Sequence, residues 1–81
     1  MSMCKAEQLE AVLSVCRNLG AEVRYHPEYG HLTAMLWDDW ANSCSEEKAR
    51  NIQNIIKEKT AQYPNLVCYC FDAFSTLVYA V

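Results

Sequence analysis

Apolar side chains recur at helical spacing in the first segment of the chain, from about residue 4 to residue 19. Charged residues such as Lys5 and Arg17 fall off this stripe, as they do on the wet side of an amphipathic helix. Gly20 follows directly, where a glycine commonly ends a helix. The pattern therefore predicts a helix whose buried stripe is Leu9, Val12, Leu13, Cys16 and Leu19.

A hairpin is predicted next, because residues 21–26 alternate between apolar and polar side chains and residues 31–37 return after a turn at Pro27–Gly30. A four-residue loop pairs His26 with His31, and this register fixes the two faces. The core face then carries Ala21, Val23, Tyr25, Leu32, Ala34 and Leu36. The opposite face carries Glu22, Arg24, His26, His31, Thr33, Met35 and Trp37.

A second helix is predicted from Ser43 or Ser45 to about Ala61. Ser43 and Glu46 have the spacing of a capping box, in which each side chain bonds the other residue's backbone N–H. Tyr63-Pro64-Asn65 breaks the helical pattern. The expected buried stripe is Ala49, Ile52, Ile55, Ile56 and Lys59.

The last segment reads as two strands, 66–71 and 74–81, around Asp72-Ala73. A two-residue or four-residue turn pairs Cys70 with Ser75 and Val67 with Val78. By analogy with the first hairpin, we expect the helix-facing set to be Val67, Tyr69, Phe71, Phe74, Thr76, Val78 and Ala80. The other side then carries Leu66, Cys68, Cys70, Ser75, Leu77, Tyr79 and Val81.

The element order α-β-β-α-β-β predicts an α+β two-layer sandwich, with both helices on one face of a four-stranded sheet. It is the order of a ferredoxin-like chain whose first strand has moved to the end, a permuted ferredoxin-like fold. We expect the strand order 1-2-4-3 with the two central strands parallel. The 81 residues suit a single domain with two helix–hairpin halves, about 3–37 and 43–81.

On the second hairpin, the side away from the helices is expected to be apolar and to lie beside Met35 and Trp37, although an exposed hairpin face is normally polar. A contiguous apolar patch of this kind usually marks an interface. The alternative is that a helix end or the 38–45 loop covers it. The residues predicted to bind a partner are Met35, Trp37, Leu66, Cys68, Leu77, Tyr79 and Val81.

Composition and charge narrow the classes of partner. Hydrophobic residues make up 52% of the chain, more than so small a domain can bury, which again favours an interface. The net charge is −3 and the seven basic residues are scattered, so we expect no direct nucleic-acid binding. No apolar run is long enough to cross a membrane and no secretory signal precedes the first helix, so neither a membrane partner nor secretion is expected.

The five cysteines form an odd set that fits no disulfide or zinc pattern, and we expect them to stay reduced in the cytoplasm. His26 and His31 flank Glu28 and could bind a metal, but further ligands are not evident. Cys68 and Cys70 lie on the opposite edge strand, about 14 Å away at three strand spacings. We therefore predict no metal, no cofactor and no catalytic residue.

Two hypotheses of function follow. The first is a small non-enzymatic protein–protein interaction module, a stoichiometric inhibitor or regulator of a larger complex that uses the apolar sheet face. By analogy of size and composition alone, inhibitors of host defence encoded by phages and mobile elements are the leading example. The alternative is a dimeric small-molecule sensor or sheet-face enzyme of ferredoxin-like type, with Tyr79, Trp37 and His31 lining a cleft.

Overall fold

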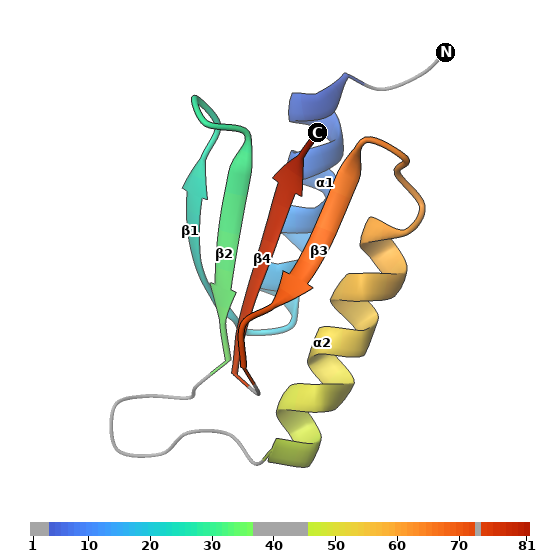
Figure 1. Ribbon diagram of the computed structural model, residues 1–81. Coiled ribbons are helices and arrows are strands. Elements are labelled where there is room, and N and C mark those ends of the chain that lie inside the picture. The colour runs from blue at the N-terminus through green and yellow to red at the C-terminus, as the bar shows by residue number, and fades with distance from the viewer. Residues whose placement is uncertain (1–3, 37–45, 73) are drawn as a thin grey trace.

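The helices and strands follow the predicted α-β-β-α-β-β order (Figure 1). The computed structural model describes residues 4–36, 46–72 and 74–81. The predicted caps Ser43 and Ser45 and the predicted site residue Trp37 lie outside the described residues. The elements are α1 (Lys5–Asn18), β1 (Glu22–His26), β2 (His31–Met35), α2 (Glu46–Thr60), β3 (Leu66–Cys70) and β4 (Ser75–Ala80).

Helix α1 begins and ends with recognisable caps. At its start the backbone N–H of Cys4 donates to Glu7 Oε1 at 3.4 Å. At its end Gly20 has a φ of 84°, and its N–H donates to the Arg17 carbonyl. The N–H of Ala21 reaches back to the Cys16 carbonyl, which completes a Schellman motif. The predicted glycine stop is therefore confirmed, and it sends the chain directly into β1.

Helix α2 buries a different stripe from the predicted one. Ala49 and Ile56 are fully buried, as expected, but Ile55 is 43% exposed. Its place is taken by two polar residues, Gln53 and Thr60, which lie on the same side of the helix as Ala49 and Ile56. Each is satisfied by a hydrogen bond from its side chain: Gln53 Nε2 donates to the Asp72 carbonyl at 2.9 Å, and Thr60 Oγ1 donates to the Ile56 carbonyl at 2.8 Å.

The first hairpin has the predicted register, with His26 opposite His31 and Val23 opposite Ala34. Its turn is closed by the N–H of Tyr29, which donates to the His26 carbonyl at 3.1 Å. Gly30 takes a φ of 70°, the left-handed conformation that the turn requires there. In this half of the chain the alternation of apolar and polar residues and the residues of the turn indicate the same register.

The sheet has the expected strand order, β1-β2-β4-β3, but its central pair is antiparallel and the prediction of a parallel pair is wrong. The reason lies in the connections. Because α2 carries the chain back along the sheet, β3 runs in the same direction as β2. The second hairpin then reverses the chain, so β4, which lies between them, runs against both neighbours.

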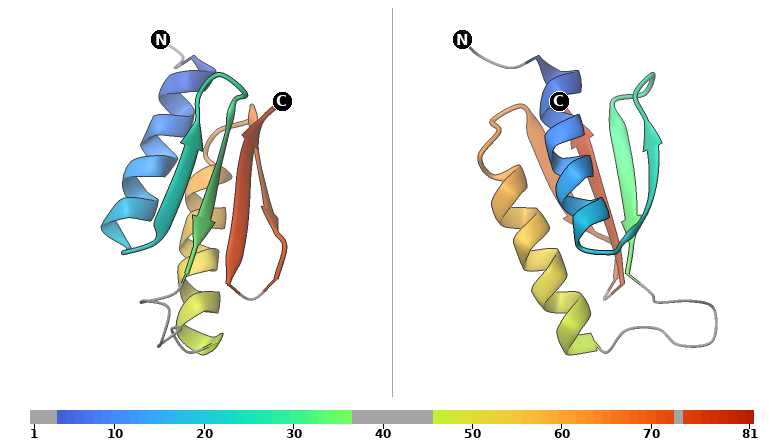
Figure 2. Two further views of the ribbon diagram at one scale, coloured as in Figure 1. Left: turned by 90° about the vertical axis from the view of Figure 1, so that its left-hand side faces the viewer. Right: turned by 180° about the vertical axis from the view of Figure 1, so that it is seen from behind.

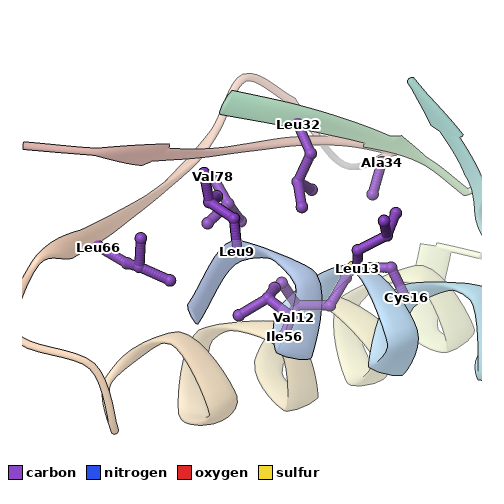
Figure 3. Close-up of a cluster of buried hydrophobic side chains, with 9 residues drawn as sticks. All are labelled: Leu9, Val12, Leu13, Cys16, Leu32, Ala34, Ile56, Leu66 and Val78. Carbon is purple, nitrogen blue, oxygen red and sulfur yellow. The ribbon is translucent and has the colours of Figure 1, made fainter. Parts of the chain in front are cut away.

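Both helices cover one face of the sheet, which confirms the two-layer α+β arrangement (Figure 2). The core lies between these layers, where side chains of α1 interdigitate with those of β2 and β4 (Figure 3). Leu36 and Ala49 extend it toward the start of α2, with Phe74 packed against them. Its main cluster consists of Leu9, Val12, Leu13, Cys16, Leu32, Ala34, Ile56, Leu66 and Val78.

Candidate functional site

The sheet face away from the helices is the candidate site, and we call it the open face. Its side chains follow from the register, because alternate residues of each strand point to the same side. They stand in three rows across β1, β2, β4 and β3. The rows are Glu22-Met35-Ser75-Phe71, Arg24-Thr33-Leu77-Tyr69 and His26-His31-Tyr79-Val67.

The two halves of the open face differ in chemistry. The half on β1 and β2 holds charged and polar groups apart from Met35. The half on β3 and β4 holds what we call the aromatic patch, in which the Tyr69 and Phe71 rings meet edge to face with their centroids 5.5 Å apart. Tyr69 is 57% exposed and Phe71 is 54% exposed, large values for aromatic rings in a small domain. The aromatic patch consists of Val67, Tyr69, Phe71, Leu77 and Tyr79.

The register of the second hairpin differs by one residue from the predicted one, which corrects the face assignment of β3. Cys70 lies opposite Thr76, not Ser75, and Val67 lies opposite Tyr79, not Val78. A shift of one residue moves every side chain of a strand to the other face. The faces of β4 are as predicted, with Val78 buried against the helices, whereas those of β3 are inverted.

The geometry of the turn explains the shift. The N–H of Phe71 donates to the Ser75 carbonyl, so three residues separate this last pair, and the predicted pairing required an even number. Within the turn the Phe74 N–H donates to Asp72 Oδ1 at 2.8 Å, an arrangement in which an Asp side chain replaces a backbone acceptor. Asp72 was the one residue in the sequence that could have indicated this turn, because an Asp side chain commonly accepts a hydrogen bond from the backbone N–H two residues later.

Of the seven predicted site residues, Trp37 lies outside the described residues and the other six divide into two groups. Met35, Leu77 and Tyr79 lie on the open face, and Val81 follows β4 with 60% exposure. Leu66 and Cys68 do not belong to it. Leu66 is 7% exposed in the core cluster, and Cys68 packs against that cluster.

Three residues of the open face were not predicted to belong to it. The pattern of the strand places Val67, Tyr69 and Phe71 on the helix-facing side, but they lie on the open side of the sheet. The open face is consequently more aromatic than expected, since the two rings stand where two thiols, those of Cys68 and Cys70, were predicted.

A cluster of rings occupies the corner of the open face at the first turn. The ring centroids of His26 and His31 are 5.1 Å apart, and Tyr29 stacks on His31 at 6.0 Å. Glu28 Oε1 lies 3.5 Å from His26 Nδ1, within reach of an ion pair when the imidazole is protonated. Among the described residues no group of three or more His, Cys, Asp or Glu side chains could hold a metal ion.

Three cysteines lie on the other side of the sheet, toward the helices. Burial raises the pKa of Cys16 to about 11, and the nearby thiol of Cys68 adds to this shift. Burial and the neighbouring thiol of Cys70 likewise raise the pKa of Cys68 to about 11. Thiols with such pKa values are protonated and unreactive at neutral pH. The described cysteines, which include exposed Cys4, form no disulfide.

Neither described helix is long and apolar enough to cross a membrane. Comparison of the chain with protein-family models, with curated protein sequences and with solved structures found no match in any of the three.

Proposed function

We propose that the protein is a small, non-enzymatic protein–protein interaction module, an inhibitor or regulator that acts by binding a larger partner through the open face. The aromatic patch is the centre of the contact. The observation that carries this proposal is the pair of half-exposed rings, Tyr69 and Phe71, beside Leu77 on a face that neither helix covers.

The exposure of the patch is unusual for a sheet in contact with water. An antiparallel sheet with one wet face normally alternates polar residues outward. Here β1 and β2 follow that rule with Arg24 and Thr33, but β3 and β4 continue the same row with Tyr69 and Leu77. An apolar patch rimmed by polar groups is typical of a binding surface, and tyrosine is enriched among residues that dominate binding energy.

The size of the open face limits the kind of complex. Three rows spaced about 6.8 Å apart along four strands spaced about 4.8 Å apart cover roughly 400 Å². A stable interface covers about 800 Å² on each partner. The partner must therefore reach past the edges of the sheet, which suits a larger protein better than a second copy stacked flat on this face.

A binding role also agrees with the chemistry of the thiols. Cys16 and Cys68 are the described cysteines nearest the core, and their raised pKa values leave them without the thiolate that a nucleophile needs. The finer prediction, that the partner is a host defence complex targeted by a phage or a mobile element, rests on size and composition alone.

A photo-crosslinking experiment tests the proposal directly. The residue p-benzoylphenylalanine is introduced at Tyr69 and, as a matched control, at Glu58, which is exposed on α2. The protein is then irradiated in the cells that express it, and crosslinked products are identified by mass spectrometry. We expect one protein to crosslink from position 69 and not from position 58.

A double substitution measures the energetics. Tyr69→Ser/Leu77→Ser should weaken binding of the crosslinked partner by at least roughly 100-fold, because two apolar side chains lose about 1.5–3 kcal/mol each of burial. The melting temperature should change little. Val78→Ser, in the fully buried core, should instead unfold the protein. Equal crosslinking from both positions, or unchanged affinity in the double variant, contradicts the proposal.

A further inference from the structure

Strand β1 forms one edge of the sheet and pairs only with β2 among the described residues. An edge strand presents a row of backbone N–H and C=O groups that another extended chain can pair with. The five residues of β1, Glu22–His26, include no proline or glycine that would interrupt such pairing. This edge therefore has the backbone of a template for a fifth strand.

Helix α1 lies alongside β1 (Figure 2). A groove of about 460 Å³ is lined by side chains of α1 and by Tyr25 of β1. Its volume is within the range of sites that hold small ligands and side chains. Leu13 provides an apolar wall and Tyr25 comes from the strand, while polar groups of α1 line the outer side. The full lining is Glu10, Leu13, Ser14, Arg17, Asn18 and Tyr25.

The groove has an acidic end and a basic end. Glu10 and Arg17 are both exposed, and they are seven positions apart along the helix, which places them about 10.5 Å apart along its axis. Because the turn at Gly20 joins α1 directly to β1, Arg17 lies near the beginning of the strand and Glu10 lies toward its end. Tyr25, near the end of β1, has a pKa raised by burial and then by the Glu10 charge, which agrees with this direction.

We propose that the edge of β1 and the α1–β1 groove bind an extended segment of a partner protein, which adds to the sheet as a strand antiparallel to β1. In this orientation the segment enters near Glu10 and leaves near Arg17. It therefore carries a basic residue first and an acidic residue about four positions later. Side chains i and i+4 of a strand point to the same side and lie about 13 Å apart. This distance is close to the separation of Glu10 and Arg17, and long charged side chains can span the difference.

This site is separate from the aromatic patch, which lies on the far half of the open face. The segment would be recognised by backbone pairing and by two charges, a mode known as β-augmentation. The two proposals can fail independently, because Tyr69→Ser/Leu77→Ser leaves the groove intact and changes in the groove leave the patch intact.

Peptide selection tests the groove with a random library in place of the natural partner. Nine-residue peptides displayed on phage are selected against the wild-type protein and against Glu10→Arg/Arg17→Glu. A second protein, Lys57→Glu/Glu58→Arg, serves as a charge-conserving control, since both of its substitutions lie on exposed positions of α2. Circular dichroism and thermal melting establish that all three proteins are folded.

We expect wild-type selection to enrich peptides with a basic residue followed by an acidic one, and the groove variant to enrich the reverse order. Wild-type peptides should bind the groove variant about tenfold more weakly, because two attractive pairs become repulsive, and should bind the α2 variant unchanged. Amide NMR shifts on titration should be largest at residues 22–26 and on the outer side of α1. No enrichment, equal binding to both variants, or shifts centred on β3 overturns the proposal.

Discussion

Replacing Thr76 by valine should stabilise the fold. Thr76 lies on β4 opposite Ala34 and Cys70, on the side that faces the helices, and its side chain is completely buried. Its hydroxyl has no hydrogen-bond partner among the described residues. Valine has nearly the same shape, so the substitution removes the buried hydroxyl without opening a cavity.

The expected gain follows from two contributions. An unsatisfied buried hydroxyl costs roughly 1–3 kcal/mol in lost hydration, and a buried methyl group contributes about 0.8 kcal/mol. Because Thr76→Val removes the first cost and adds the second gain, the two contributions add, and we expect the free energy of unfolding to rise by about 2–4 kcal/mol. In a domain of this size each kcal/mol raises the melting temperature by about 4–8 °C.

Urea denaturation followed by circular dichroism measures the change, and Thr60→Val is the matched control. Thr60 is also buried, but its hydroxyl donates to the Ile56 carbonyl at 2.8 Å. In Thr60→Val the loss of this hydrogen bond offsets the stabilisation from the added methyl group, since a typical hydrogen bond contributes about 0.5–1.5 kcal/mol net. The midpoint should therefore rise clearly for Thr76→Val and stay nearly constant for Thr60→Val. Equal midpoints for the two variants, or a lower one for Thr76→Val, would show that the Thr76 hydroxyl is satisfied in solution.

Three further predictions concern the thiols and one turn. At pH 8, iodoacetamide should alkylate exposed Cys4 at least about tenfold faster than buried Cys16 or partly buried Cys68, since burial shields these two thiols and raises their pKa values to about 11. Equal rates by peptide mass spectrometry would contradict this shielding. The contribution of these two thiols to the unfolding free energy should be constant below pH 9 and fall between pH 9 and 11, because the unfolded chain, with thiol pKa values near 9.0, loses these protons first. Urea titrations at pH 8 and pH 11 measure that difference, and a rise at alkaline pH would refute the sign. Gly20→Ala should cost about 1 kcal/mol through its φ of 84°, as no atom lies within 4 Å of the new methyl group, and Gly20→Asn should cost less.

The helix and hairpin of the first half of the chain could be predicted almost completely, because the alternation of side chains, the turn residues and the glycine at the helix end all indicate the same structure. Strict alternation from Ala21 to His26 fixes which residues face the helices. Pro27 and Gly30 fix the length of the turn, and length fixes the register. Gly20 marks the helix end for a backbone reason, its positive φ, that is independent of what surrounds it.

The candidate site was only partly predictable, because the second hairpin lacks these constraints. Residues 66–71 are apolar on both sides of the strand, so alternation could not say which side is buried. The register then depended on the turn, where hydrogen bonds of Asp72 to Phe74 and to Gln53 of α2 produce a loop with an odd number of residues. The bond to Gln53 joins parts of the chain that only the folded structure brings together. It also explains why Gln53, and not Ile55, is buried.

The position of β4 has a consequence for how the protein is made. This strand is the last of the four in the sequence, yet it lies in the middle of the sheet and pairs with both β2 and β3. During synthesis the two halves of the sheet therefore cannot join until residues 75–80 have left the ribosome. Until then the inner edges of β2 and β3 stay unpaired, and such edges invite association with other chains. A stop codon within β4 would thus split the sheet through its centre, and the shortened chain would be directed to aggregation or degradation.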